Sequence, residues 1–514
     1  MFKNHPKGLL AAALANMGER FGFYTMMAIL VLFLQAKFGL SGTNAGLIYS
    51  IFYFSIYILA FVGGLIADKT RNYKSTILIG LIVMAVGYFM LAFPTPTPVP
   101  NKILFLVISC FGLFTIAFGN GLFKGNLQAL VGQMYDNQTY GKMRDSGFSL
   151  FYMFINVGAL FAPLVAVGMR NWWLARNSFE YKASLPELCH GYLEGTLTPE
   201  AQERLTTLAT QVSLNGPVTD LGAFVNDYLN VFTTGFHYAF GVAIIAMAIS
   251  LTIYLVNKNR FPNPASKAKS GAGSHPSADE IHMDAKEVKQ RLYALFAVFG
   301  VVIFFWFSFH QNGLTLTFFA KAYTNLSGIV INLGLVTIQG AEIFQSINPI
   351  FIVLLTPIIM AVFGWLRARG KEPSTPKKIA IGMFIAALAY VVMAVGSLGL
   401  PLKTEVDAMG GLTDAQRVTP MLLIGTYFIL TVAELFISPL GISFVSKVAP
   451  PQYQGIMQGG WLGATAIGNQ LLFIGAIFYG NVPMWITWTV FVVACLISMF
   501  TMLFMLRWLE RVAK

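Results

Sequence analysis

Charged side chains are rare inside the long apolar segments of this sequence, and they are the residues whose chemistry needs an explanation. Glu19 and Arg20 are adjacent in the first apolar segment, Lys124 lies in the fourth, and Glu434 lies in a late one. An ionised group at the centre of a bilayer costs at least ~2.5 kcal/mol, so each predicts a functional site. Cations in the first half and an anion in the second predict a site for a zwitterion.

Polar and aromatic residues accompany these charges. Helical i, i+4 spacing places Asn16, Arg20 and Tyr24 on one face of the first segment. His310 changes charge near neutrality and is a candidate proton carrier, although a neutral hydrogen-bonded histidine is an equally good interpretation. The residues that can line a cavity by hydrogen bonding or stacking are Tyr24, Tyr57, Asn156, Gln311, Asn348 and Trp461.

The composition predicts that lipid surrounds the elements that position these residues. Hydrophobic residues make up 56% of the chain, charged residues make up 11%, and the mean hydropathy is +0.66. Because a span needs about 20 apolar residues, we predict an all-α polytopic fold of about twelve transmembrane helices. They are expected near 8–36, 43–67, 73–94, 102–133, 145–169, 232–256, 291–319, 335–365, 377–400, 419–447, 453–479 and 482–508.

The spans divide into two bundles of about six, because a polar Pro-, Ser-, Lys- and Gly-rich stretch interrupts them at 257–290. We expect residues 1–169 plus 232–256 to form the first bundle and 291–514 to form the second. The segment 170–231 is too polar to span and is expected to be a partly helical extracytoplasmic insertion, with a helix start at Thr198. Basic loops place both termini in the cytoplasm.

Several functions are disfavoured by the same sequence. The net charge of +12 comes from loop residues, which argues against nucleic-acid binding. Three scattered cysteines support neither a disulfide framework nor a metal site, and we expect no metal and no cofactor. The chain lacks hydrolase and zinc-protease motifs, so a membrane enzyme is not expected. It also lacks the repeated filter segments or charge rings of a channel.

Several motifs resemble the proton-dependent oligopeptide transporter family of the major facilitator superfamily. The family's first-span signature, E-x-x-E-R-F-x-Y-Y, corresponds here to 16–24, and 63–68 and 151–158 are similar to its next motifs. In the second half, 305–306, 345–349, 437–441 and 459–461 also match, so the resemblance covers most of the chain outside 170–231 and 257–290.

The resemblance implies a major facilitator fold that imports di- or tripeptides, or peptide-like zwitterions, by alternating access with protons. Arg20 and Lys124 would bind the peptide carboxylate, while Asn156, Asn348 and Glu434 would bind its amine and backbone. Tyr24, Tyr57 and Trp461 would shape side-chain pockets. The protein would be a monomer in a bacterial inner membrane.

Departures from the family pattern concern proton coupling. Asn16 replaces the first glutamate of the signature, Met27 stands where a basic residue is usual, and His310 occupies an often acidic position. The proton would then be carried by Glu19, His310 or Glu434. An uncoupled peptide facilitator, or a major facilitator transporter of another small anion or metabolite, remains an alternative.

Overall fold

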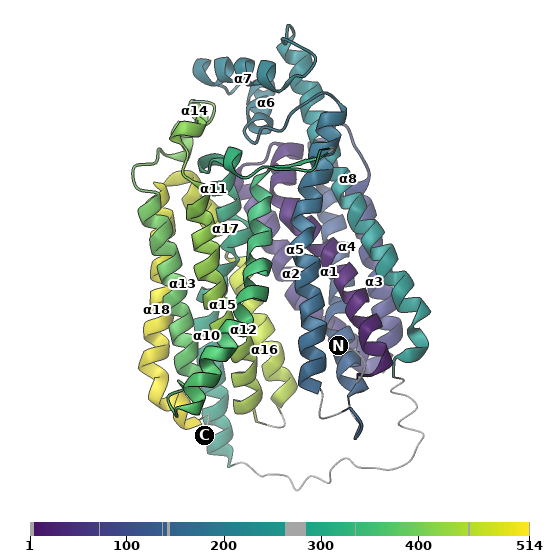
Figure 1. Ribbon diagram of the computed structural model, residues 1–514, viewed down its shortest axis with the longest axis vertical. Helices are drawn as coiled ribbons and strands as arrows, with labels where there is room; N and C mark the ends of the chain where they lie inside the picture. The colour runs from purple at the N-terminus through teal and green to yellow at the C-terminus, as the bar shows by residue number, and fades with distance from the viewer. Residues whose placement is uncertain are drawn as a thin grey trace.

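The computed structural model describes residues 5–70, 72–135, 137–140, 144–262, 284–334, 336–450 and 453–512. Within these residues, 12 helical spans are long and apolar enough to cross a membrane, which confirms the predicted all-α polytopic fold. The spans run roughly parallel to the long axis of the molecule (Figure 1). Residues 263–283, most of the predicted linker at 257–290, lie outside the described part of the chain.

The first bundle contains six spans, which pack chiefly through α1 against α5 and α8 and through α3 against α4. Small residues allow close packing, as where Gly63 and Gly121 bring the backbones of α2 and α4 together. The six helices are α1 (Lys7–Phe38), α2 (Gly42–Thr70), α3 (Tyr73–Ala92), α4 (Lys102–Met134), α5 (Arg144–Arg176) and α8 (Leu221–Val256).

The second bundle also has six spans, and α13 packs against both α15 and α18. The continuous helices are α13 (Thr375–Gly396), α15 (Pro420–Val448) and α18 (Met484–Val512). Two spans are broken, one into α10 (Ala285–Phe309), the 3-10 turn η3 (His310–Gly313) and α11 (Thr315–Tyr323), and one into α16 (Gln454–Gln470) and α17 (Phe473–Asn481). The remaining span is α12 (Ile347–Ala368), preceded by the 3-10 turn η5 (Ala341–Ser346).

The structure corrects the start of the span predicted at 335–365. A two-stranded antiparallel hairpin of β1 (Ile331–Asn332) and β2 (Thr337–Ile338) occupies this region, and α12 begins only at Ile347. The Asn332 side chain accepts a hydrogen bond from the Gly334 amide at 2.8 Å, and Gly334 has a φ of 83°, so this turn chemistry prevails over local hydropathy. The turn η4 (Leu326–Gly328) precedes the hairpin.

The segment between the fifth and sixth spans is shorter than 170–231. The helix α5 continues to Arg176, and α8 already starts at Leu221, where the Asp220 side chain caps the Ala223 amide. Between them lie α6 (Leu185–Glu194) and α7 (Pro199–Val212), the latter capped by Thr198 as its sequence predicts. The predicted segment was too long because α5 and α8 both extend beyond their apolar stretches into polar sequence, which in α8 includes Asp227.

The described ends of the chain lie at the same end of the molecule, opposite α6 and α7 (Figure 1). A short helix, α14 (Lys403–Ala408), and the turn η6 (Asp414–Gln416) connect α13 to α15 beside α7, and η2 (Lys258–Arg260) follows α8. The bundles meet where α2 packs against α16 and α17, and where α5 packs against α12 and η5. Polar contacts between the bundles, among the described residues, gather toward the α6/α7 end.

Candidate functional site

Glu19 and Arg20 form a paired unit on α1. Arg20 donates from Nε to Glu19 Oε2 at 2.5 Å and from Nη2 to Oε1 at 2.7 Å, and its guanidinium lies 4.7 Å from the Phe23 ring centroid. Asn120 of α4 donates to Glu19 Oε1 at 2.8 Å. Both charged side chains are buried, so Glu19 balances the Arg20 charge and ties α1 to α4.

Lys124, one helical turn beyond Asn120 on α4, has a different environment. Its Nζ lies 5.0 Å from the ring centroid of Tyr57 on α2, a cation–π contact, and the side chain is half-buried. Among the described residues no carboxylate lies within ion-pair distance of it. An ammonium group inside a span favours an anionic partner, so Lys124 is a candidate to bind an anionic ligand group.

Glu434 of α15 is the matching anion of the second bundle. Its Oε2 accepts a hydrogen bond from the Asn348 amide at 2.8 Å, and the same amide donates to Thr431 Oγ1 at 3.0 Å. No cation among the described residues pairs with this half-buried carboxylate. Glu434 does interact electrostatically with Tyr24 and Tyr57 of the first bundle, so the two bundles face each other here.

Tyr152 and Asn156 lie on α5 beside this group. Tyr152, which was not singled out from the sequence, is 52% exposed near the start of its span and interacts electrostatically with Glu434 and Tyr24. Asn156 is buried and donates to the Tyr152 carbonyl at 3.1 Å, within its own helix. The aromatic Phe-Tyr pattern at 151–152 was the available signal for Tyr152.

His310 lies at the break between α10 and α11. Its Nδ1 is 2.5 Å from Asn469 Oδ1, and its ring lies between Trp306, at a centroid distance of 4.8 Å, and Tyr53 of the first bundle, at 4.7 Å. The histidine is therefore held on three sides at the interface between the bundles. Asn469 and Tyr53 were not singled out from the sequence, because their role depends on a contact between distant helices.

Gln311 and Trp461 make contacts within the second bundle. The Gln311 amide donates to the carbonyls of Phe307 and Leu472 at 3.2 Å, and Thr315 donates to its oxygen at 2.5 Å. The bond to Leu472 joins the two helix breaks and the other two bonds lie within the broken span of Gln311 itself, which favours a structural role for Gln311. Trp461 is buried and packs where Gly441 leaves space on α15.

A cavity of about 510 Å³ lies elsewhere, between the α6/α7 segment, the end of α1 and the second bundle. Within it, Glu187 of α6 lies 3.2 Å from Lys321 and 3.0 Å from Lys403, and Lys403 also pairs with Asp407. Burial raises the pKa of Glu187, but the two ammonium groups outweigh burial and hold that pKa well below its usual range. This network joins the bundles and is separate from the Lys124–Glu434 region.

Comparison with known proteins identifies the chain. A family model described as "PTR2: POT family" matches residues 74–275 and 277–479. The peptide transporter YePEPT of Yersinia enterocolitica is 28% identical over 494 residues, covering 91% of this chain and 87% of the relative. The dipeptide and tripeptide permease A of Chromobacterium violaceum is 29% identical over 454 residues, covering 88% and 81%.

Solved structures agree on the fold. A crystal structure of the peptide transporter POT in complex with sulfate superimposes with a TM-score of 0.71 at 23% identity, covering 100% of this chain and 96% of the other. A POT family transporter in complex with 5-aminolevulinic acid superimposes with a TM-score of 0.70 at 22% identity, covering 100% and 98%.

Twelve spans in two bundles, together with the family match and the named relatives, define a multi-pass membrane transporter of the major facilitator class rather than an enzyme. This chain belongs to the POT family of peptide transporters, because the family model covers well over half of its length.

Proposed function

We propose that this transporter imports di- and tripeptides and peptide-like zwitterions by alternating access, driven by an inward proton gradient. The observation that carries the proposal is a pair of charges that have no ion-pair partner among the described residues, Lys124 in the first bundle and Glu434 in the second. A zwitterion can satisfy both at once and thereby draw the bundles together. Named relatives that are dipeptide and tripeptide permeases support the same substrate class.

In this proposal the ligand carboxylate binds Lys124, with Arg20 beside it, and the ligand amine binds Glu434. Asn348 orients the Glu434 carboxylate, and Asn156 contacts the peptide backbone. Aromatic residues then shape the side-chain pockets, and these are Tyr24, Tyr57, Tyr152 and Trp461. Arg20 and Glu434 both act electrostatically on Tyr24, which supports a path from one charge to the other.

The proposed orientation has both termini in the cytoplasm of a bacterium and α6 and α7 outside the inner membrane. It is supported by the shared position of the described chain ends and by the basic residues of the predicted cytoplasmic loops (Figure 1). We further propose that each six-span bundle moves as a unit, that 257–290 links them, and that the protein acts as a monomer.

The test is uptake of labelled Ala-Ala into liposomes containing the purified protein, with and without an inward proton gradient. Lys124→Ala should reduce gradient-driven accumulation at least about tenfold, because the peptide carboxylate loses the ammonium group that binds it. Lys102→Ala, which removes an exposed lysine from the start of the same helix, should leave uptake unchanged.

Other results would point to the alternatives. Equilibration without accumulation in the parent protein would indicate an uncoupled facilitator. No uptake of Ala-Ala would overturn the peptide assignment in favour of another small anion or metabolite.

A further inference from the structure

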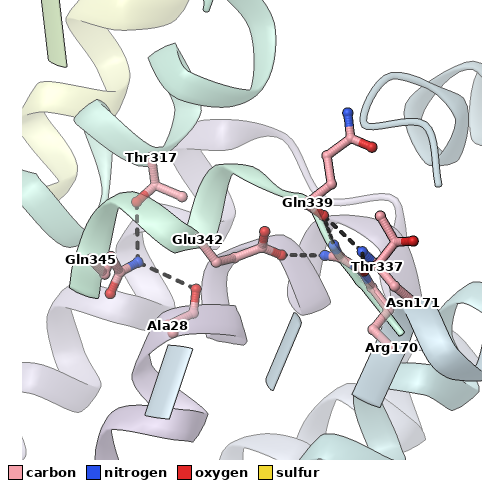
Figure 2. Close-up of polar contacts among 8 residues, drawn as sticks. All are labelled: Ala28, Arg170, Asn171, Thr317, Thr337, Gln339, Glu342 and Gln345. Atoms are coloured by element: carbon pink, nitrogen blue, oxygen red, sulfur yellow. Dashed lines mark hydrogen bonds and ion pairs between the residues drawn. The ribbon is translucent and has the colours of Figure 1, made fainter. Parts of the chain in front are cut away.

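A buried ion pair joins the two bundles near the α6/α7 end. Arg170, close to the end of α5, pairs through Nη1 with Glu342 Oε1 in the turn η5 (Figure 2), and both side chains are 0% exposed. In the described part of the chain, it is the one fully buried ion pair between bundles, since the links from Glu187 to Lys321 and Lys403 leave the glutamate 44% exposed.

Hydrogen bonds extend this contact along the hairpin. Arg170 Nη2 donates to the Gln339 carbonyl at 3.0 Å, and the Asn171 amide donates to the carbonyls of Thr337 and Gln339 at 2.8 and 2.9 Å. The segment from β2 to η5 of the second bundle therefore docks onto the end of α5 through main-chain acceptors as well as through the ion pair (Figure 2).

The turn η5 also contacts a second helix of the first bundle. Gln345 donates to the Ala28 carbonyl of α1 at 3.3 Å and to Thr317 Oγ1 of its own bundle at 3.2 Å. Figure 2 shows this contact at the opposite end of η5 from Arg170. A single short turn is thus held against both α1 and α5, so it moves with the second bundle only if these contacts break.

The two partners of the ion pair are supported differently. The Arg170 guanidinium lies over the rings of Tyr181, Phe232 and Phe236, at 4.1, 5.4 and 5.4 Å, and its Nε donates to Asn171. These residues belong to the first bundle and its insertion, so they hold the arginine in place whether or not the second bundle is docked. Glu342 Oε2, in contrast, is buried without a hydrogen-bond partner among the described residues.

We propose that Arg170, Asn171 and Glu342 form a gate that closes the α6/α7 end of the transporter and opens when the segment from β2 to η5 leaves α5. The proposal rests on the alternating access proposed above. In the open state water hydrates both charges, whereas in the closed state each needs the other. Removing one partner therefore penalises only the closed state, while removing both replaces the pair by apolar packing at little cost.

The experiment measures the closed and open populations directly. Spin labels are attached to cysteines at Asp227 of α8 and Met421 of α15, both exposed and on different bundles, in the full-length chain with Cys110, Cys189 and Cys495 replaced. Distance distributions in lipid nanodiscs are then compared for the parent, Arg170→Met, Glu342→Leu and the double variant. Each single variant should raise the ratio of long to short distances at least about tenfold, and the double variant should return it to the parent value.

Arg367→Met is the matched control, because it breaks the exposed ion pair with Glu372 within the second bundle and should leave the distances unchanged. Unchanged distances in the single variants, or a double variant as open as the singles, would overturn the gate. If the single variants are not monodisperse, Asn171→Ala decides: a shift to long distances supports the gate, and no shift overturns it. Because no peptide is needed, a working gate in a protein that takes up no Ala-Ala would contradict only the proposed substrate.

Discussion

Four ionisable residues within the spans are accommodated in two different ways. Glu19 and Arg20 neutralise each other and receive a further hydrogen bond from Asn120, so their charges are satisfied without a ligand. Among the described residues, Lys124 contacts the ring face of Tyr57, Glu434 accepts from the Asn348 amide, and neither has an ion-pair partner. Since an uncompensated charge in a span is costly, the second pair is where ligand binding yields the most free energy.

Proton coupling is expected to depend on Glu434 rather than on His310. One oxygen of the half-buried Glu434 carboxylate accepts from Asn348, which leaves the other for a proton or a ligand amine, whereas the His310 ring is enclosed by Trp306, Tyr53 and Asn469. Glu434→Gln should therefore reduce gradient-driven accumulation of Ala-Ala at least about tenfold and should weaken peptide counterflow less, because the new amide oxygen can still accept a hydrogen bond from the ligand amine. His310→Gln should retain accumulation, and the reverse pattern would assign the proton to His310.

At the scale of elements, two broken spans and one close helix crossing position the site. A break in a helix leaves backbone carbonyls without their helical hydrogen bonds. The Gln311 amide at one break donates to such a carbonyl, that of Leu472, at the other break. The crossing of α2 and α4 places Tyr57 beside Lys124, and it depends on glycines, because a Cβ on Gly121 would overlap the Leu59 backbone.

Substituting Gly121 should therefore cost stability in a position-specific way. Gly121→Ala forces the backbones of α2 and α4 apart and should destabilise the protein by about 1–3 kcal/mol, as overpacked contacts do. Thermal unfolding in detergent, followed by tryptophan fluorescence, measures the effect. Gly125→Ala is the matched control one turn later on α4, where a Cβ meets no atom within 4 Å. Equal melting temperatures for the two variants would contradict the predicted backbone contact.

At the scale of the whole molecule, the α6/α7 insertion forms a bridge between the bundles. Glu187 of α6 pairs with Lys321 of α11 and Lys403 of α14, and Thr198 donates to the Ala408 carbonyl at 2.5 Å. Because Glu187 is partly exposed, we expect this outer bridge to contribute at most ~1 kcal/mol, which is less than the penalty for leaving Arg170 or Glu342 buried without its partner. The insertion is thus expected to tune closure rather than to determine it.

The bridge should resist mild acidification. Burial raises the pKa of Glu187, but Lys321 and Lys403 lower it by more than burial raises it. The contribution of Glu187 to stability is therefore complete above a pH of about 4.3, the unfolded value, and is lost only as the pH falls through the depressed folded value. Burial and the nearby Glu187 charge raise the pKa of Asp407, so protonation of Asp407 on acidification relieves repulsion within the cluster.

Spin labels at Leu193 and Met409 should accordingly report the same distance at about pH 7.5 and about pH 5.5, whereas Glu187→Gln should broaden the distribution at both. A distance that lengthens at about pH 5.5 in the parent protein would contradict this account.

The candidate site was predictable to the extent that single residues reveal it. Lys124 and Glu434 are visible in the sequence because a charge in an apolar run is conspicuous on its own. Asn120, Tyr152 and Asn469 were missed, because polar and aromatic residues are common in such runs and only a cross-helix partner distinguishes them. Gln311 was predicted to line the cavity, but it donates to Leu472 across two helix breaks that hydropathy does not reveal.

Hydropathy alone was sufficient for the number of spans and for their approximate positions, because lipid selects each helix through its own local composition. Partnerships between distant residues, such as Arg170 with Glu342 or Asn348 with Glu434, required the tertiary structure. The physical reason is that membrane helices associate through packing and hydrogen bonds between surfaces rather than through hydrophobicity. Which charges are paired, and which remain available to a ligand, is therefore decided only when the helices pack against one another.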